Sequence, residues 1–354
     1  MKLHIAGGVG EHGRSCFFVE GAHATFIVDC GLMPGSETPY PHLTDKQILA
    51  ARYLFITHSH LDHTGAFPWL VEHGFSGCVI MTRETAGQVS FTPERVCIID
   101  ETVPTLSDTE WTDDLAVRWG RSGHCAGSVW YAIKQNGQTM LFSGDYVEDT
   151  LAYRCDPLRG IQAEMAVLDS AYGNKDCSPA AYREELVKNV KTLAEQGKRI
   201  VFPVPRYGRG LELLVLFHKH FPHIHISMDR HLQNELSRVD EVEDWLKPES
   251  YLALKEMQNK GYASANSDES AFVFLCDPQL KTLEGQKLAM GIANENGSII
   301  LTGNTDTGSS SERLLRSGIA VFFRYSVHMS HAERERLENL NVFSKTVPYH
   351  CGNA

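Results

Sequence analysis

The stretch His58-Ser-His60-Leu-Asp62-His63 places three imidazoles and one carboxylate within six positions of the chain. Imidazole and carboxylate together suit Zn²⁺, and also Fe or Mn, better than a metal that prefers thiolates. A solvated polar turn is the alternative interpretation, but such turns seldom hold this density of ligating groups. We therefore interpret the stretch as a metal site.

The flanking sequence predicts that this site is catalytic. Residues 51–57 are apolar and rich in β-forming residues, which predicts a buried strand. Residues 64–74 favour a helix closed by Gly74. His58 and His60, two positions apart in an extended segment, can point the same way, while the next two ligands turn away. One loop can then serve two ions with open coordination, which is typical of catalytic metals.

Length and composition indicate an ordinary globular protein. The 354 residues suffice for one large domain or two smaller ones, with 42% hydrophobic and 22% charged residues. An apolar run of about 18 residues is lacking, so no membrane span is expected. The first residues resemble a strand rather than a signal peptide. Nine scattered cysteines without a CxxC pair predict free thiols and a cytoplasmic protein.

The net charge of −11 limits how the chain can hold a nucleic acid. Binding a polyanion by charge alone needs a positive surface. Two divalent ions would change the charge only to −11 + 4 = −7. Phosphate recognition is therefore expected to be local, through metals and a few Arg and His side chains.

Two later turns offer further ligands. Gly123-His124-Cys-Ala-Gly127 presents a histidine before the strand-like residues 129–133, and Ser143-Gly144-Asp145 follows a strand from Thr139. An Asp in such a turn can bridge two cations. Either turn alone is usually structural, but both follow the histidine loop in order.

This order resembles that of the metallo-β-lactamase fold hydrolases. The resemblance implies an αββα sandwich in which His58, His60 and His124 hold one ion, Asp62 and His63 hold the second, and Asp145 bridges them. Two Zn²⁺ ions are expected, with Mn²⁺ or Fe as alternatives.

Four later segments resemble motifs of the β-CASP nucleases, a branch of that superfamily. Val167-Leu-Asp169-Ser-Ala-Tyr-Gly173 is similar to motif A, and Pro203-Val-Pro-Arg-Tyr-Gly-Arg209 to a loop of the inserted cassette. Ser330-His331-Ala-Glu-Arg-Glu-Arg-Leu337 is similar to motif B, and Val347-Pro-Tyr-His350-Cys351 to motif C. The resemblance implies that His331 is the general acid, that Asp169 orients it, and that His350 completes the second metal shell. Asp62 counts among the catalytic residues as well.

The same resemblance sets the expected domains. Residues 1–176 and 316–354 would form the sandwich, and residues 177–315 an inserted parallel α/β cassette, since strand-like and helix-like segments alternate there. The expected substrate contacts are Arg209, His328 and Ser330. One departure from the family pattern is Leu275-Cys-Asp277, where an acidic residue would repel phosphate.

The leading hypothesis is a dimetal ribonuclease that cuts single-stranded RNA. His350 favours RNA because the DNA-specific branch of the family commonly lacks a histidine there. Two alternatives remain open: a phosphodiesterase for DNA, nucleotides or another small phosphoester, and an inactive scaffold in an RNA-processing complex. The sequence leaves the oligomeric state open, a homo-oligomer included.

Overall fold

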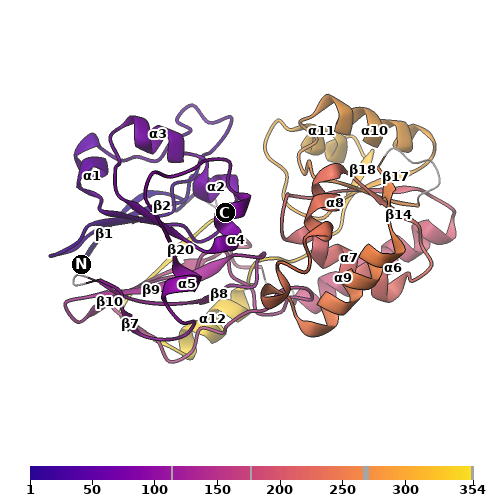
Figure 1. Cartoon of the computed structure of the whole chain (residues 1–354). Helices are drawn as coiled ribbons and strands as arrows, with labels where there is room; N and C mark the ends of the chain where they lie inside the picture. The colour runs from indigo at the N-terminus through magenta and orange to yellow at the C-terminus, as the bar shows by residue number, and fades with distance from the viewer. Residues whose placement is uncertain (113–114, 176–177, 266–270, 352–354) are drawn as a thin grey trace. The chain divides into compact units, whose positions relative to one another are not determined.

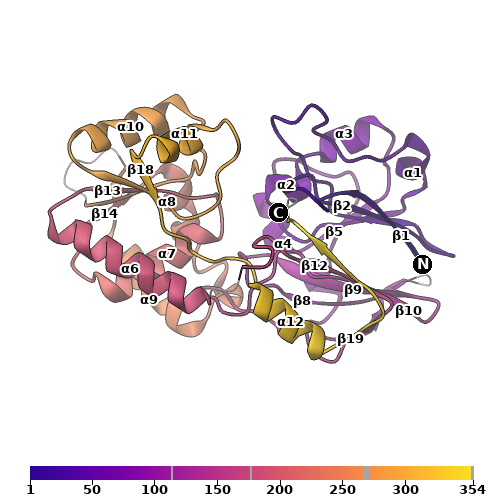
Figure 2. The same ribbon diagram turned by 180° about the vertical axis from the view of Figure 1, so that it is seen from behind.

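The computed structural model describes residues 1–112, 115–175, 178–265 and 271–351, and it separates into two compact units (Figures 1 and 2). The first unit comprises Met1–Glu148, Cys155–Asp176 and His328–Ala354, and the second comprises Asp149–Arg154 and Cys177–Val327. The predicted αββα sandwich with a parallel α/β cassette is confirmed as the fold class.

The first unit begins with a six-stranded sheet whose strands follow chain order. These strands are β1 (Lys2–Gly7), β2 (Cys16–Glu20), β3 (Phe26–Val28), β4 (Tyr53–Phe55), β5 (Cys78–Met81) and β6 (Val96–Ile98). Its helices are α1 (Asp45–Ala50), α2 (Leu61–Thr64), α3 (Phe67–Glu72), α4 (Arg83–Gln88) and α5 (Ile99–Thr102). Figures 1 and 2 show α1 and α3 on the outer face of this sheet.

The second sheet of the first unit has the strand order β20-β12-β10-β9-β8-β7. The strands are β7 (Thr109–Glu110), β8 (Ala116–Arg121), β9 (Val129–Gln135), β10 (Gln138–Phe142), β12 (Met165–Asp169) and β20 (Thr346–Tyr349). The helix α12 (His331–Asn339) lies on its outer face (Figures 1 and 2), beside a small pair of strands, β11 (Gln162–Ala163) and β19 (Val342–Phe343).

Aromatic residues join the two sheets of the sandwich. Phe17 of β2 contacts Phe142 of β10 with ring centroids 5.9 Å apart, and Phe55 of β4 contacts Tyr131 of β9 at 5.4 Å. The neighbour of Phe55, Leu54, faces the other way and packs with the helix residues of α1 and α3. This alternation is what a strand buried on both faces requires.

The second unit contains a parallel sheet with the order β15-β14-β16-β13-β17-β18. Its strands are β13 (Ile200–Pro203), β14 (Ile226–Met228), β15 (Ala263–Ser264), β16 (Phe272–Leu275), β17 (Ser298–Leu301) and β18 (Ala320–Phe322). Its helices are α6 (Pro179–Glu195), α7 (Arg209–His220), α8 (Arg230–Ser237), the 3₁₀ helix η1 (Glu243–Trp245), α9 (Pro248–Lys260), α10 (Leu283–Asn294) and α11 (Ser310–Arg316). Figures 1 and 2 show α10 and α11 on one face and α6, α7 and α9 on the other.

Two expectations about chain division differ from this arrangement. The return to the first unit was expected near residue 316, but β18 still pairs with β17, and the return comes at His328. The short segment Asp149–Arg154 joins the second unit because its backbone N–H groups bind the carboxylate of Glu212. The expected limit between residues 176 and 177 falls outside the described residues.

Candidate metal centre

The histidine loop lies between β4 and α2, as the sequence predicts. His58 follows the end of β4, His60 is the residue before α2, and Asp62 and His63 lie within that single helical turn. Gly31 packs so closely against the carbonyl of Asp62 that an added Cβ would overlap it, so the close approach requires glycine here. The predicted helix after His63 is divided into α2 and α3, so the ligands occupy a short, sharply turned segment.

Strand pairing brings the later residues of the site together. β12 runs parallel to both β10 and β20, so the carboxyl ends of these three strands meet at one edge of the second sheet. Asp145 follows β10, Asp169 ends β12 and His350 follows β20. Three residues that are far apart in the sequence thereby become neighbours.

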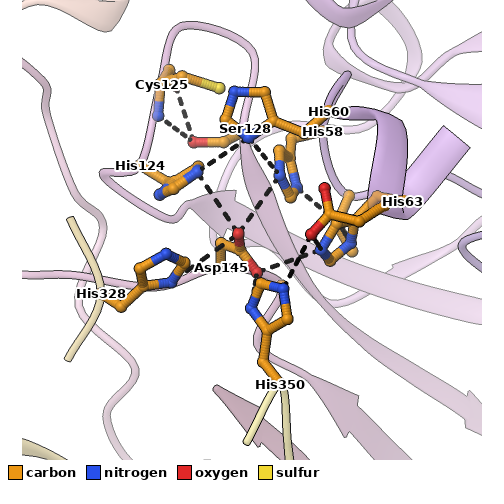
Figure 3. Close-up of polar contacts among 12 residues, drawn as sticks. His58, His60, His63, His124, Cys125, Ser128, Asp145, His328 and His350 are labelled. Atoms are coloured by element: carbon orange, nitrogen blue, oxygen red, sulfur yellow. Dashed lines mark hydrogen bonds and ion pairs between the residues drawn. The ribbon is translucent and has the colours of Figure 1, made fainter. Parts of the chain in front are cut away.

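The first cluster contains His58, His60, His124 and Asp145. His60 Nδ1 lies 3.2 Å from Nε2 of both His58 and His124. Asp145 Oδ2 lies 3.5 Å from His58 Nε2 and 3.4 Å from His124 Nε2 (Figure 3). A tetrahedral ion with ligands at about 2.0–2.1 Å would separate its ligand atoms by about 3.3–3.4 Å. The four side chains are therefore spaced as ligands of one Zn²⁺-sized ion would be.

The other oxygen of Asp145 faces a second group of ligands. Asp145 Oδ1 lies 3.3 Å from His63 Nε2 and 3.3 Å from His350 Nδ1. Asp62 Oδ2 lies 3.8 Å from His63 Nε2 and 2.9 Å from His350 Nε2. Asp145 thus faces both groups, one oxygen toward each, as expected of a bridging carboxylate. The structure brings together all seven predicted metal ligands, which are His58, His60, Asp62, His63, His124, Asp145 and His350.

Asp29 binds the ring nitrogen of His63 that does not face Asp145. Its Oδ2 accepts hydrogen bonds from His63 Nδ1 and from the Thr57 hydroxyl, both at 2.8 Å, while its Oδ1 accepts one from the Thr57 backbone N–H at 2.8 Å. A proton on Nδ1 leaves the lone pair of Nε2 directed at Asp145. Carboxylates that fix a histidine in this way are common behind metal ligands. No sequence pattern indicated this role, although Asp29 directly follows a short apolar strand, much as Asp145 closely follows one.

The electrostatics of the metal-free cluster indicate that positive charge is needed there. Burial would lower the pKa of His350, but Asp145 and Asp62 raise it to about 10. The pKa of His63 likewise lies well above its usual value, against the effect of burial, because three carboxylates surround it. Burial and the neighbouring His63 hold the pKa of His58 well below its usual value. Protons on two rings thus balance carboxylates that a cation would otherwise neutralise.

The pairing expected between Asp169 and His331 is not formed. Asp169 Oδ2 instead accepts a hydrogen bond of 2.8 Å from Nδ1 of His328, a residue expected only as a substrate contact. The His328 ring lies 4.9 Å from that of His124 and 5.4 Å from that of His350, and Figure 3 shows it beside Asp145. His328, and not His331, is the histidine that adjoins the cluster.

The reason lies in the start of α12. Ser330 is its N-cap and forms a capping box with Glu333, so His331 becomes the first helical residue. The His331 ring accepts a hydrogen bond from Arg334 at 2.9 Å and lies 3.5 Å from Glu335, along the helix. The Ser330 hydroxyl, expected to contact substrate, is engaged in the cap. Arg209, the third expected substrate contact, is the first residue of α7 in the second unit, and its guanidinium packs against Gly303.

The side chains fit divalent metal on three grounds. The donor set is imidazole and carboxylate, which Zn²⁺ accepts. Two buried ring nitrogens, His63 Nε2 and His350 Nδ1, lack a hydrogen-bond partner within the described part of the chain, at the point where both face Asp145 Oδ1. Four carboxylates also gather here, Asp29, Asp62, Asp145 and Asp169, whose negative charge divalent metal would offset.

A search of protein-family models supplies the deciding observation. The model described as the metallo-beta-lactamase superfamily matches residues 9–204, which is more than half of the chain. The chain belongs to the metallo-β-lactamase superfamily. Within the described residues, no helix of this superfamily member has the length and apolar character needed to cross a membrane.

Two relatives of this metallo-β-lactamase protein carry names that describe RNA cleavage and transcription termination. It is 26% identical to an Aspergillus fumigatus protein named endoribonuclease ysh1 over 251 residues, which cover 62% of this chain and 29% of that protein. It is 28% identical over 251 residues to the transcription termination factor FttA of Methanothermobacter thermautotrophicus, covering 62% of this chain and 40% of that one. The chain therefore spans well under half the length of these two relatives. They bear out the predicted β-CASP, RNA-processing branch.

A solved structure extends the likeness of fold to the whole chain. The crystal structure of a protein of unknown function from Enterococcus faecalis V583 superposes with a TM-score of 0.59, at 14% sequence identity. The match covers 99% of this chain and 94% of that one. Both compact units thus belong to a fold that occurs elsewhere.

Proposed function

We propose that this protein is a two-metal phosphodiesterase that cleaves RNA. The observation that carries the proposal is the Asp169–His328 pair beside the His and Asp cluster. Hydrolysis of a thioester releases a thiolate, which needs no additional acid, whereas a departing ribose oxygen is a poor leaving group and needs a proton. The relative named as an endoribonuclease supports RNA as the substrate class.

The metal ligands would form two groups. His58, His60 and His124 would hold one ion, Asp62, His63 and His350 the other, and Asp145 would lie between them. Two divalent ions held there would supply the chemistry of two-metal hydrolases, which is to acidify water and to neutralise charge developing on a scissile phosphate. Zn²⁺ is the ion we propose, with Mn²⁺ or Fe as alternatives.

His328 would supply the proton for the leaving oxygen. Its Nδ1 donates to Asp169, whose Oδ2 also accepts the Tyr146 backbone N–H at 3.0 Å and whose Oδ1 accepts that of Ala171 at 3.0 Å. These bonds fix the carboxylate, which in turn fixes the ring, so that Nε2 is the nitrogen left to carry a transferable proton. His328 thus takes the general-acid role that the sequence had given to His331.

The test compares two histidines three residues apart. His328→Ala should lower turnover of labelled single-stranded RNA by about 10²–10⁴-fold, the usual contribution of a general acid. Its metal content per chain should not change, because His328 is not assigned as a ligand. His331→Ala is the matched control and should retain most activity. Full activity of the His328→Ala protein, with the loss appearing in His331→Ala instead, would refute the assignment.

A second candidate, a phosphodiesterase for DNA or small esters, rests on the acidic charge of −11. Labelled DNA and bis-p-nitrophenyl phosphate belong in the same assay for this reason. Turnover of the small ester without cleavage of either polymer would favour this second function. The carboxylate of Asp277, the residue that departs from the family pattern, binds the backbone N–H groups of Lys281 and Thr282 ahead of α10.

A further inference from the structure

His12 lies on the outer side of the metal centre and has no role in the scheme above. It belongs to the loop between β1 and β2. Its imidazole stacks on that of His350, with ring centroids 4.2 Å apart and planes 25° from parallel. His350 is buried, whereas His12 is exposed. An accessible ring therefore covers a buried, metal-facing one.

The loop that carries His12 is fixed by its backbone to His350 and to Asp62. The backbone N–H of His350 donates to the Gly8 carbonyl at 2.7 Å, and the N–H of Ser15 donates to the Asp62 carbonyl at 2.8 Å. Between these points, the Glu11 carboxylate accepts the N–H of Gly8 at 3.1 Å. A loop held at both ends keeps the ring in place before any ligand arrives.

One role to consider for His12 is that of an additional metal ligand. A ring nitrogen of His12 lies within 4.8 Å of the ligand atoms of Asp62 and His350. The lone pair of an imidazole nitrogen, however, lies in the plane of its ring. In two stacked, nearly parallel rings, the lone pairs point in nearly parallel planes. They do not converge on one ion that lies about 2 Å from a nitrogen of each ring. The stacking therefore argues against shared coordination with His350.

We propose that His12 is a stacking platform for a nucleobase next to the bond that is cut. This inference rests on the proposed function and adds how the RNA is held. A protein with a net charge of −11 gains little from long-range attraction to a polyanion. Stacking on aromatic or histidine rings does not depend on charge, and it is a common way for proteins to bind unpaired bases. The exposed ring beside the metal ligands supplies such a surface.

The test measures binding by fluorescence anisotropy in the metal-loaded full chain. The probes are a single-stranded phosphorothioate RNA, which resists cleavage, and an abasic ribose-phosphate oligomer of the same length. His12→Ala should raise the Kd for RNA roughly tenfold, the usual loss for one stacked base, and leave the Kd for the abasic oligomer unchanged. His12→Phe, which keeps a stacking ring without nitrogens, should restore RNA binding. Metal content per chain is measured for each variant.

Each other outcome overturns the inference. An unchanged Kd in His12→Ala, or equal weakening for both oligomers, would exclude base stacking. Loss of metal in His12→Ala and in His12→Phe would make His12 a ligand. A wild-type protein that binds neither oligomer and cuts no RNA would overturn the proposed function itself, and that result is visible without any His12 variant.

Discussion

Replacing Asp29 by asparagine tests whether the centre depends on a carboxylate that is not assigned as a metal ligand. Asp29 is buried, with 1% of its surface exposed, and accepts three hydrogen bonds of 2.8 Å, two from Thr57 and one from His63. An amide has the same shape but only one accepting atom. Its one oxygen can accept either from the Thr57 backbone N–H or from the pair formed by the Thr57 hydroxyl and His63 Nδ1. It cannot accept from both.

Each orientation of the amide introduced by Asp29→Asn has its own cost. If its oxygen stays with the Thr57 N–H, its NH₂ group faces His63 Nδ1, and the ring proton must move to Nε2. His63 can then no longer direct a lone pair at Asp145 Oδ1, 3.3 Å away. If the amide is reversed, the Thr57 N–H is left buried opposite another donor, at a cost of about 1–3 kcal/mol.

The expected result is a loss in metal binding rather than a loss of fold. Removing a carboxylate behind a metal-binding histidine typically weakens affinity about 10–100-fold, or about 1.4–2.7 kcal/mol. Metal per chain is measured by elemental analysis after dialysis against graded chelator, and denaturant melts give the unfolding free energy of the metal-free form. Asp45→Asn, at an exposed acid of α1, is the control. Wild-type metal affinity together with wild-type stability in Asp29→Asn would refute the reasoning.

Four further predictions concern pH, a helix cap and a buried carboxylate. In the metal-free protein the pKa of His350 rises to about 10 and that of His63 also rises. Metal binding should therefore release protons, and the metal affinity should increase with pH. Calorimetry in buffers of different ionisation enthalpy would measure both effects. The same raised pKa of His350 stabilises the metal-free fold below the usual histidine value, and that stability should be lost as pH rises toward 10, as thermal melts in chelator would reveal. Ser330→Ala should cost about 1 kcal/mol of unfolding free energy and leave metal content unchanged, since its hydroxyl caps α12. Glu212→Gln should destabilise the second unit by about 1–3 kcal/mol in urea melts, because its buried carboxylate accepts the Tyr325 hydroxyl at 2.5 Å and two backbone N–H groups.

The parallel α/β class of the cassette was predictable because its patterns are local, whereas the αββα sandwich was predicted by resemblance. The strands β13, β16 and β17 are short apolar runs of mostly buried residues, and such runs carry their own signal in the sequence. Residues 223–227 also resemble a strand, but β14 begins only at Ile226. The position at which the chain returns to the first unit was not predicted correctly, because β18 is short. Its pairing with β17, and not its composition, assigns β18 to the cassette.

The site was predictable where its residues are close in sequence and only by resemblance where they are not. His58, His60, Asp62 and His63 share one loop, so spacing alone brings them together. Asp62 and His350 are 288 positions apart and meet because β20 pairs with β12, a contact that no local pattern encodes.

The assignment of the general-acid role to His328 instead of His331 has a purely local cause. Ser-x-x-Glu is both a helix start and part of what resembled motif B, and the helix start prevails here because Ser330 and Glu333 satisfy each other's backbone N–H groups. A histidine that begins a helix has its ring held along that helix by Arg334 and Glu335. A histidine three residues earlier lies in a non-helical segment where that constraint does not apply, so its ring can meet the carboxylate at the end of β12. The position of the helix cap therefore selects which of the two histidines can serve as the acid.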